Sequence, residues 1–283
     1  MSNIIKAIIN ISNNPIVELK NAYLGKNKIN NVGDALERYV QDAFANTLNK
    51  DNLEEKDREK IISEIFSYKG NSRNPPDIIL KNGDAIEVKK IEKKNSSIAL
   101  NSSYPKHKLY STDSRITNAC RNCEEWTTKD IIYVVGTITD KKLRSLWFIY
   151  GDCYAASAES YTSIYRKIKE SIHSLKEVEF TKTNELGKIN KIDPLGITNL
   201  RIRGMWHIEN PSSVFNMYVP SEDVSGFNLT CIMRKSKFES HNNNDIKNLM
   251  NCKNVSICDI EIKDPDNTAN LLEAKLITVR GDQ

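Results

Sequence analysis

The sequence predicts an α/β fold with a central mixed β-sheet flanked by helices, and three features of the chain lead to this prediction. Helical periodicity dominates the first part of the chain, over residues 3–11, 33–48 and 53–67. A strand–turn–strand pattern follows at 74–90. Two almost continuous apolar runs, 131–138 and 146–150, are then typical of central strands covered on both faces. This order favours a single α/β domain with additions to its core.

The spacing of apolar residues justifies the helices. The first segment has isoleucines on one face, at Ile4, Ile5, Ile8 and Ile9. The segment 33–48 has a stripe at three-and-four spacing, made by Leu36, Tyr39, Val40, Ala43, Phe44 and Leu48. A later amphipathic helix, 158–176, has one made by Tyr161, Ile164, Tyr165, Ile168, Ile172 and Leu175. We expect a loop at 70–76 and strands at 200–203 and 227–233.

Size and composition are those of an ordinary soluble protein. A chain of 283 residues can bury a sizeable core, and 39% hydrophobic with 28% charged residues is typical of globular proteins. The longest apolar run, 131–138, is too short to cross a bilayer, and the N-terminus lacks the basic and apolar regions of a secretory signal. We therefore expect no membrane association and a cytoplasmic location.

The six cysteines are dispersed along the chain. Cys120 and Cys123 are the only close pair with metal-like spacing, and no second CxxC or HxxxH completes a zinc site. Reduced structural thiols are favoured, with a zinc site at this pair as the alternative. The four histidines also lack the spacing of a catalytic triad or a zinc site.

The segment 74–90 reads as a β-hairpin that carries acids on its strands. Asn82-Gly83 is a favourable turn, and Glu87 and Lys89 alternate with Ile86 and Val88 along the return strand. With a turn of Asn82-Gly83, Asp77 pairs with Val88 and faces away from Glu87. With a turn of residues 82–84, Asp77 pairs with Lys89, and all three polar side chains share one face. A shared site requires this second register, or a kink after Pro76.

This hairpin suits a magnesium site. Two carboxylates, Asp77 and Glu87, with the main-chain carbonyl of Val88 between them, supply the oxygen ligands that Mg²⁺ prefers. Bound Mg²⁺ activates water and stabilises charge on a phosphodiester, and Lys89 could orient that water. The alternative is a structural ion pair on the hairpin. Glu37 lies at the edge of the apolar stripe of the 33–48 helix.

The pattern resembles the PD-(D/E)XK nuclease superfamily, and the wider chain is similar to type II restriction endonucleases of the NgoPII type. The segments that carry the resemblance lie at 8–17, 33–37, 70–77, 83–91 and 99–109. The resemblance implies Mg²⁺-dependent cleavage of double-stranded DNA by a homodimer at a short palindrome, GGCC. It implies that Asp77 and Glu87 are metal ligands and that Lys89 is the catalytic lysine. It also implies an acid from the first core helix near the metal, which makes Glu37 a further catalytic candidate, with a solvent-facing glutamate as its alternative. It also implies a cognate DNA methyltransferase as a partner in the system rather than a direct binder.

By the same resemblance, residues 1–283 form one restriction-endonuclease-like domain. Its catalytic core covers roughly residues 30–180, and DNA-recognition additions cover roughly 95–125 and 195–245.

Positive charge gathers after the hairpin, with seven lysines against three acids from Lys81 to Lys108, as suits a polyanion. The residues that we expect to contact DNA are Asn101, Ser102, Ser103, Tyr104, Lys106, His107, Lys108, Arg201, Arg203, Arg234, Lys235 and Lys237. Hydroxyls, amides and lysines contact phosphates and base edges, and arginine pairs bidentately with guanine. The alternatives are an exposed polar loop for the first seven residues and solvated side chains for the rest.

Three functions remain open at this point. The first is a restriction endonuclease. The second is a structure-specific repair or recombination nuclease built on the same core. The third is a DNA-binding protein that keeps the hairpin as architecture and cuts nothing.

Overall fold

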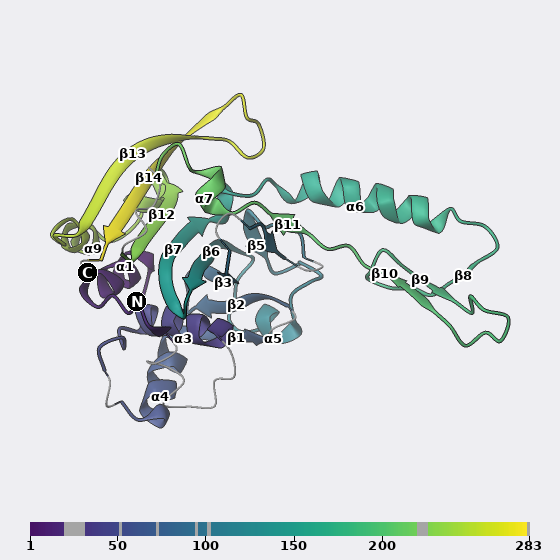
Figure 1. Cartoon of the computed structure of the whole chain (residues 1–283), viewed down its shortest axis with the longest axis horizontal. Helices are drawn as coiled ribbons and strands as arrows, with labels where there is room; N and C mark the ends of the chain where they lie inside the picture. Colours follow the sequence, from purple (N-terminus) through teal and green to yellow (C-terminus); the bar gives the residue numbers. More distant parts are fainter. Residues whose placement is uncertain are drawn as a thin grey trace.

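The computed structural model of the protein describes residues 1–19, 32–50, 53–71, 74–93, 96–100, 103–219 and 226–281. These residues have the predicted α/β fold, in which helices flank a mixed sheet (Figure 1). The strands lie in the order β1-β2-β3-β6-β7-β12-β14-β13, and β5 also pairs with β6. Their bounds are β1 Phe66–Asn71, β2 Asn74–Leu80, β3 Ala85–Ile91, β5 Lys108–Tyr110, β6 Thr128–Thr139, β7 Lys142–Tyr150, β12 Asn228–Arg234, β13 Val255–Lys263 and β14 Leu271–Arg280. The helices are α1 Ile4–Asn13, α3 Val32–Ala45, α4 Glu55–Ile65, α5 Asn118–Arg121, α6 Ala158–His173, α7 Pro211–Val214, α8 Lys235–Glu239 and α9 Asn243–Met250, with a 3₁₀ turn η1 at Gly151–Cys153.

The centre of the sheet is built from β3, β6 and β7. β3 pairs antiparallel with β2 and parallel with β6, while β6 pairs antiparallel with β7. The apolar runs predicted as central strands are buried, from Ile131 to Val135 in β6 and from Leu146 to Tyr150 in β7. Because β3 has a strand on each side, its side chains are held at fixed positions within the sheet.

Helices α1 and α3 pack together, and α3 lies against β3 and the neighbouring strands. A Cβ at Gly136 of β6 would lie 2.7 Å from Leu36 Cδ2, so the absence of a side chain there lets α3 approach the sheet closely. Phe44 of α3 meets Phe148 of β7 edge-on, with ring centroids 6.2 Å apart. The apolar stripe of the predicted helix therefore faces the sheet.

Two parts of the sheet differ from prediction. The loop expected at 70–76 was wrong, because Gly70 and Asn71 end β1 and residues 74–76 begin β2. Likewise, the antiparallel pair β13 and β14 was not predicted, although it extends the sheet beyond β12.

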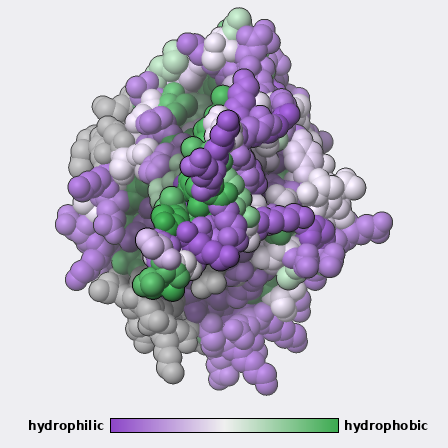
Figure 2. All heavy atoms as spheres, turned by 90° about the vertical axis from the view of Figure 1, so that its right-hand side faces the viewer, coloured by the Kyte–Doolittle hydropathy of each residue, from purple (hydrophilic) through white to green (hydrophobic). Residues whose placement is uncertain are grey.

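An arm of residues 158–208 projects from the body of the molecule (Figure 1). It consists of α6 and a sheet of order β10-β9-β8, with β8 at Glu179–Phe180, β9 at Gly187–Asn190 and β10 at Leu200–Ile202. The helix expected at 158–176 is thus present, but none of its residues is buried in the described chain. Seen from the end of the arm, a strip of hydrophobic side chains lies among hydrophilic ones (Figure 2).

The base of the arm is fixed by aromatic side chains. Tyr161 of α6 stacks on Tyr104 with ring centroids 5.5 Å apart, and Trp206 meets both rings edge-on. Next to Trp206, β11 (His207–Ile208) pairs with β4 (Ile98–Ala99). These contacts hold the segment around Tyr104 against the start of the arm. In the described ranges, no helix is long and apolar enough to cross a membrane.

Candidate active site

The predicted hairpin is formed by β2 and β3, but its register differs from both predicted registers. The paired residues are Ile78 with Ile86 and Ile79 with Ala85. The turn therefore consists of residues 81–83, and Asn82 in its middle has a φ of 55°. It has three residues, as the shared face requires, but it begins one residue before the predicted turn at 82–84.

This register brings Asp77 to the side of the sheet that carries Glu87. Continued by one residue beyond Ile78, it sets Asp77 opposite Glu87, so the predicted pairing with Lys89 was wrong. Directly opposed residues share a face of a sheet, and therefore Asp77 shares the face of Glu87 and Lys89 all the same.

The carboxylate of Asp77 is held by the backbone of β3. Asp77 Oδ2 accepts a hydrogen bond of 2.6 Å from the Val88 N–H. In an extended strand, the N–H and C=O of one residue point to the same edge. The carbonyl of Val88 therefore faces the side of β3 on which Asp77 lies.

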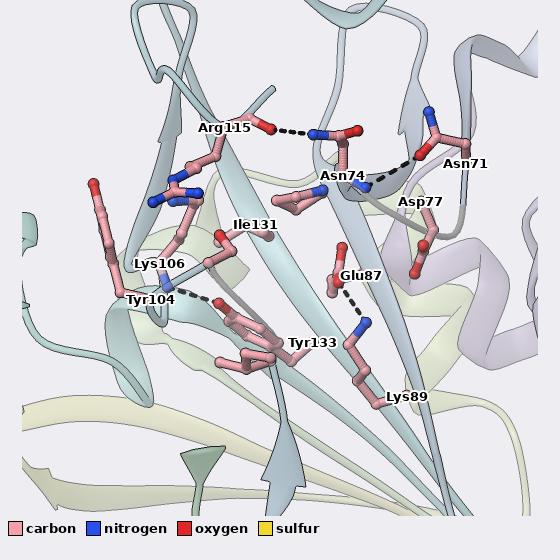
Figure 3. Close-up of a pocket in the computed structure, with 13 residues that line it drawn as sticks. Asn71, Asn74, Asp77, Glu87, Lys89, Tyr104, Lys106, Arg115, Ile131 and Tyr133 are labelled. Carbon is pink, nitrogen blue, oxygen red and sulfur yellow. Dashed lines mark hydrogen bonds and ion pairs between the residues drawn. The ribbon is translucent and has the colours of Figure 1, made fainter. Parts of the chain in front are cut away.

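Glu87 and Lys89 form a close pair within the same site (Figure 3). Glu87 Oε1 and Lys89 Nζ are 2.5 Å apart. Glu87 is only 8% exposed, and its other oxygen, Oε2, has no hydrogen-bond partner among the described residues. Burial works to lower the pKa of Lys89, but the charges of Glu87 and Asp77 raise it overall, so Lys89 stays protonated. The structural ion pair considered as the alternative is present, but it satisfies only one oxygen of Glu87.

The two carboxylates repel each other in a buried place. Burial, and then the charge of Glu87, raise the pKa of Asp77 to about 8. A proton or a cation is therefore needed for both carboxyl groups to be accommodated near neutral pH. An unsatisfied buried oxygen beside a repelled carboxylate is the donor set that suits a bound cation.

Glu37 lies near this pair without joining it. Burial, and then the charge of Asp34, raise the pKa of Glu37, and Gln41 Nε2 donates a hydrogen bond of 3.2 Å to it. The charge of Glu37 also contributes to the raised pKa of Asp77. Across the described ranges, no three His, Cys, Asp or Glu side chains come together to hold a metal ion. Glu37 is thus partly buried beside the site rather than solvent-facing.

A pocket of about 180 Å³ opens over the hairpin, a volume equal to roughly six water molecules in the liquid. Figure 3 shows Asp77, Glu87 and Lys89 on one side of it and Tyr104, Lys106 and Arg115 on the other. The pocket therefore has an acidic side with one lysine, and a second side with two further cations.

Comparison with known proteins places nearly the whole chain in one family. The sequence matches the NgoPII restriction endonuclease family over residues 2–263. It is 49% identical over 277 residues to the type II restriction enzyme NgoPII of Neisseria gonorrhoeae, which covers 98% of this chain and 99% of that protein. The chain belongs to the NgoPII restriction endonuclease family. No solved structure matches it.

Membership of the NgoPII family confirms the first of the three functions considered, a restriction endonuclease that acts on DNA as a site-specific deoxyribonuclease. Type II restriction endonucleases generally use divalent metal ions. The acidic side of the pocket has the chemistry for such an ion.

The segment after the hairpin, expected to contact DNA, divides into several parts in this NgoPII-family chain. Ser103, Tyr104 and Lys106 line the pocket. Lys106 is only 3% exposed, so an exposed polar loop does not describe it. His107 is partly buried beside Tyr110, and Lys108 Nζ lies 2.5 Å from an oxygen of Asp130. Asn101 and Ser102 lie outside the described residues.

The remaining predicted DNA contacts are distant from the hairpin in sequence and already have ionic partners. Arg201 and Arg203, on the arm, both pair with Glu185, at 2.7 and 2.8 Å. Lys237 Nζ lies 2.8 Å from Asp84 and 2.7 Å from Asp130.

Near Lys237, two more predicted contacts have acidic neighbours. Arg234 lies 3.7 Å from Asp152, and Lys235 lies 3.4 Å from Glu273. The role of all these residues in DNA binding stays a prediction.

Arg115 and Tyr133 are among the pocket residues that sequence reasoning missed. Arg115 reaches the pocket because Asn74 Nδ2 donates a 2.9 Å hydrogen bond to its carbonyl oxygen. Tyr133 of β6 is paired in register with Glu87 and lines the same pocket. The apolar residues around Tyr133 predict a strand but do not indicate a functional site. The residues next to Arg115 in the sequence form no recognisable motif.

All six cysteines are free thiols. Burial raises the pKa of Cys120 to about 12, so this thiol stays protonated at neutral pH. Within the described ranges no third His, Cys, Asp or Glu joins Cys120 and Cys123 to hold a metal ion, and this favours the structural interpretation of Cys120 over the zinc alternative.

Proposed function

We propose that this endonuclease makes Mg²⁺-dependent double-strand cuts in DNA at the palindrome GGCC, with Asp77, Glu87 and Lys89 as its catalytic residues. One observation carries the proposal. The three side chains line one pocket, where one oxygen of Glu87 has no hydrogen-bond partner among the described residues and the pKa of Asp77 is raised. The sequence GGCC rests on the family resemblance alone.

Asp77, Glu87 and the Val88 carbonyl are the groups that would hold Mg²⁺. They are all oxygen donors, which this hard cation prefers, and few enough to leave several of its waters in place. When bound, Mg²⁺ supplies an activated water and stabilises negative charge on the phosphodiester. The hydrogen bond from the Val88 N–H keeps Asp77 Oδ2 in position, and deprotonation of Asp77 accompanies loading of the site.

Lys89 supplies the positive charge on this side of the pocket. Its pairing with Glu87 Oε1 holds the ammonium beside the carboxylates and keeps it protonated. From there it donates a hydrogen bond to the attacking water and stabilises the charge that develops on the phosphoryl oxygens. A bond forms from the water oxygen to phosphorus, and the bond from phosphorus to O3′ breaks. The attacking water gives up one proton to solvent, and the leaving 3′ oxygen takes up one from solvent, giving 5′-phosphate and 3′-hydroxyl ends.

A homodimer is the economical arrangement for a palindromic site, because each subunit then cuts one strand of a two-fold sequence. A cognate methyltransferase of the same specificity would protect the host DNA, and both enzymes would act in the cytoplasm. Neither partner is needed for the chemistry described above.

The test is plasmid cleavage by the purified protein with Mg²⁺, and with Ca²⁺ in its place. The variant Lys89→Ala should abolish the discrete fragments that the wild type gives with Mg²⁺. Lys90→Ala is the matched control, since Lys90 is the next residue of β3, points to the other face and pairs with the exposed Glu92. Sequencing the fragment ends gives the recognition site.

Other outcomes would reject the proposal. A smear without preferred sites would favour the repair-nuclease alternative, and Mg²⁺-independent binding without cutting would favour a non-catalytic protein. Ends that do not map to GGCC would refute the proposed sequence while leaving the catalytic residues in place.

A further inference from the structure

The side of the pocket opposite the carboxylates has a composition of its own. Arg115, Lys106 and Ser103 line the pocket, and Figure 3 shows Arg115 and Lys106 across the cavity from Asp77 and Glu87. None of the three belongs to the hairpin. Their placement beside the acidic side needs a separate explanation.

Among the described residues, the guanidinium of Arg115 has neutral hydrogen-bond partners, whereas its backbone N–H donates a 2.8 Å hydrogen bond to Asp113 Oδ1. Its guanidinium donates hydrogen bonds to the Asn184 carbonyl at 3.0 Å and to the Tyr165 hydroxyl at 3.3 Å. No carboxylate of the described residues lies within ion-pair distance of it. Its backbone carbonyl is tied to Asn74, on the same strand as Asp77. Arg115 is therefore a positioned cation whose guanidinium forms no ion pair within the described part of the chain.

Lys106 is held rigidly behind this surface. Its Nζ lies 2.6 Å from Asp113 Oδ2 and 3.9 Å from the centre of the Tyr104 ring. Its backbone N–H donates a 2.7 Å hydrogen bond to the Tyr133 hydroxyl. Because Tyr133 pairs in register with Glu87, this bond fixes the distance between the segment of Lys106 and the acidic side.

Ser103 adds a donor that no described residue uses. Its Oγ is buried and has no hydrogen-bond partner within the described residues. Buried hydroxyls without partners are rare in folded proteins, and those in a pocket point to a ligand atom. A hydroxyl next to an unneutralised guanidinium favours a ligand that is an anion with several oxygens, and arginine binds phosphate groups through two parallel hydrogen bonds.

The charges of the pocket lead to the same ligand. Lys89 is paired with Glu87, and Lys106 is paired with Asp113. Arg115 has no ion-pair partner among the described residues, and it lies across the pocket from the residues that the proposed function assigns to Mg²⁺. A phosphodiester between the two sides would meet a cation on each.

We propose that Arg115 and Ser103, positioned by Lys106, bind the scissile phosphodiester of DNA across the pocket from Asp77 and Glu87. The proposal rests on the proposed function, because it takes the pocket to be where DNA is cut. Arg115 contacts the non-bridging oxygens, and Ser103 donates one further hydrogen bond. Lys106 acts as a positioning residue.

The test measures whether Arg115 responds to the charge of that one phosphate. After the cut is mapped, duplexes carrying a neutral methylphosphonate at the scissile position are compared with normal duplexes for binding in Ca²⁺. We expect the wild type to bind the neutral duplex about 10- to 100-fold more weakly, the range for a hydrogen bond to a charged group. Arg115→Met should bind the normal duplex about 10- to 100-fold more weakly than the wild type does. Its affinity for the methylphosphonate duplex should be almost the same as its affinity for the normal duplex.

Two further variants complete the design. Lys142→Met removes an exposed lysine at the turn between β6 and β7, and it should keep the full wild-type response to the methylphosphonate. Ser103→Ala, a small change, should reduce that response even if Arg115→Met folds poorly in thermal unfolding. A merely structural role of Arg115 would weaken binding to both duplexes equally and leave their ratio unchanged.

The inference is overturned if Arg115→Met and Ser103→Ala keep the wild-type ratio, or if they respond only at a neighbouring phosphate. These outcomes are separate from failure of the proposed function, in which the wild type itself would not cut plasmid DNA. Single-turnover cleavage should fall with Arg115→Met by about 100-fold, the effect of losing one donor to developing charge.

Discussion

Replacing Asp77 with asparagine is expected to stabilise the metal-free endonuclease while abolishing DNA cleavage. In the absence of metal, burial and the charge of Glu87 disfavour an ionised carboxyl at this position. An amide there remains able to accept the 2.6 Å hydrogen bond from the Val88 N–H, and it brings no charge. The variant therefore keeps the contact and removes the repulsion.

The size of the gain follows from the pKa of Asp77, which rises from 3.8 to about 8 on folding. Because the folded pKa is the higher one, the unfolded chain releases this proton first, and stability falls by about 1.4 kcal/mol per pH unit between the two values. At pH 7 the upper bound is roughly 4 kcal/mol, and relaxation of the site leaves an expected gain of about 1–3 kcal/mol. For a chain of this size, the melting temperature should rise by about 2–6 °C.

The assay is thermal unfolding in EDTA at several values between about pH 5 and about pH 8. The difference between Asp77→Asn and the wild type should grow with pH over this range. Glu239→Gln, which changes an exposed carboxylate on α8, serves as the control and should show no such growth. A gain that is absent, or that stays constant with pH, would refute the repulsion between Asp77 and Glu87.

Three other substitutions test the surroundings of the site. Gly151→Ala would put a Cβ 2.3 Å from the Lys106 carbonyl oxygen, so it should destabilise the fold by about 1–3 kcal/mol in denaturant unfolding and slow cleavage. Lys237→Met should cost about 2–4 kcal/mol at neutral pH. This loss of stability should be smaller in acid. Burial works to raise the pKa of Asp130, but hydrogen bonds from Lys108 and Lys237 lower it overall. The stabilisation that the ionised Asp130 contributes is therefore lost as the pH falls through its pKa in the folded protein. An unfolding difference independent of pH would contradict this. Glu37→Gln should slow single-turnover cleavage by about tenfold or less, and complete loss of cleavage would instead make Glu37 a metal ligand.

Local patterns predicted much of the fold. Some patterns depend only on residues close together in the chain, such as the apolar stripe at 33–48 and the apolar runs at 131–138 and 146–150. The structure contains the helix and the two strands that these patterns predict. β1 escaped prediction because the helix expected at 53–67 includes Phe66 and Ser67, and the loop expected at 70–76 includes Gly70 and Asn71. The strand forms by pairing with β2. By contrast, the sequence of β13 does contain a strand pattern that could have predicted it. Apolar residues stand two apart at Val255 and Ile257 and again at Ile260 and Ile262.

The acidic side of the site could be predicted, and the cationic side could not. Asp77, Glu87 and Lys89 lie within one hairpin, so alternation along a strand relates them to one another. The turn shifted by one residue, because its position is decided by pairing between whole strands rather than by Asn82-Gly83 alone. Arg115 enters through a hydrogen bond to Asn74, which no local pattern can reveal.

The arm has a consequence for how this chain tolerates change. β7 and β12 pair directly, Phe148 with Cys231, although the arm and its flanking segments separate them in the sequence. Closing a longer connection between two such strands adds only about 0.6 kcal/mol of entropy loss for each doubling of its length. Insertions and deletions in the arm should therefore leave the free energy of the sheet almost unchanged. Residues far out on the arm can diverge between relatives while the strand that carries Glu87 and Lys89 remains as it is.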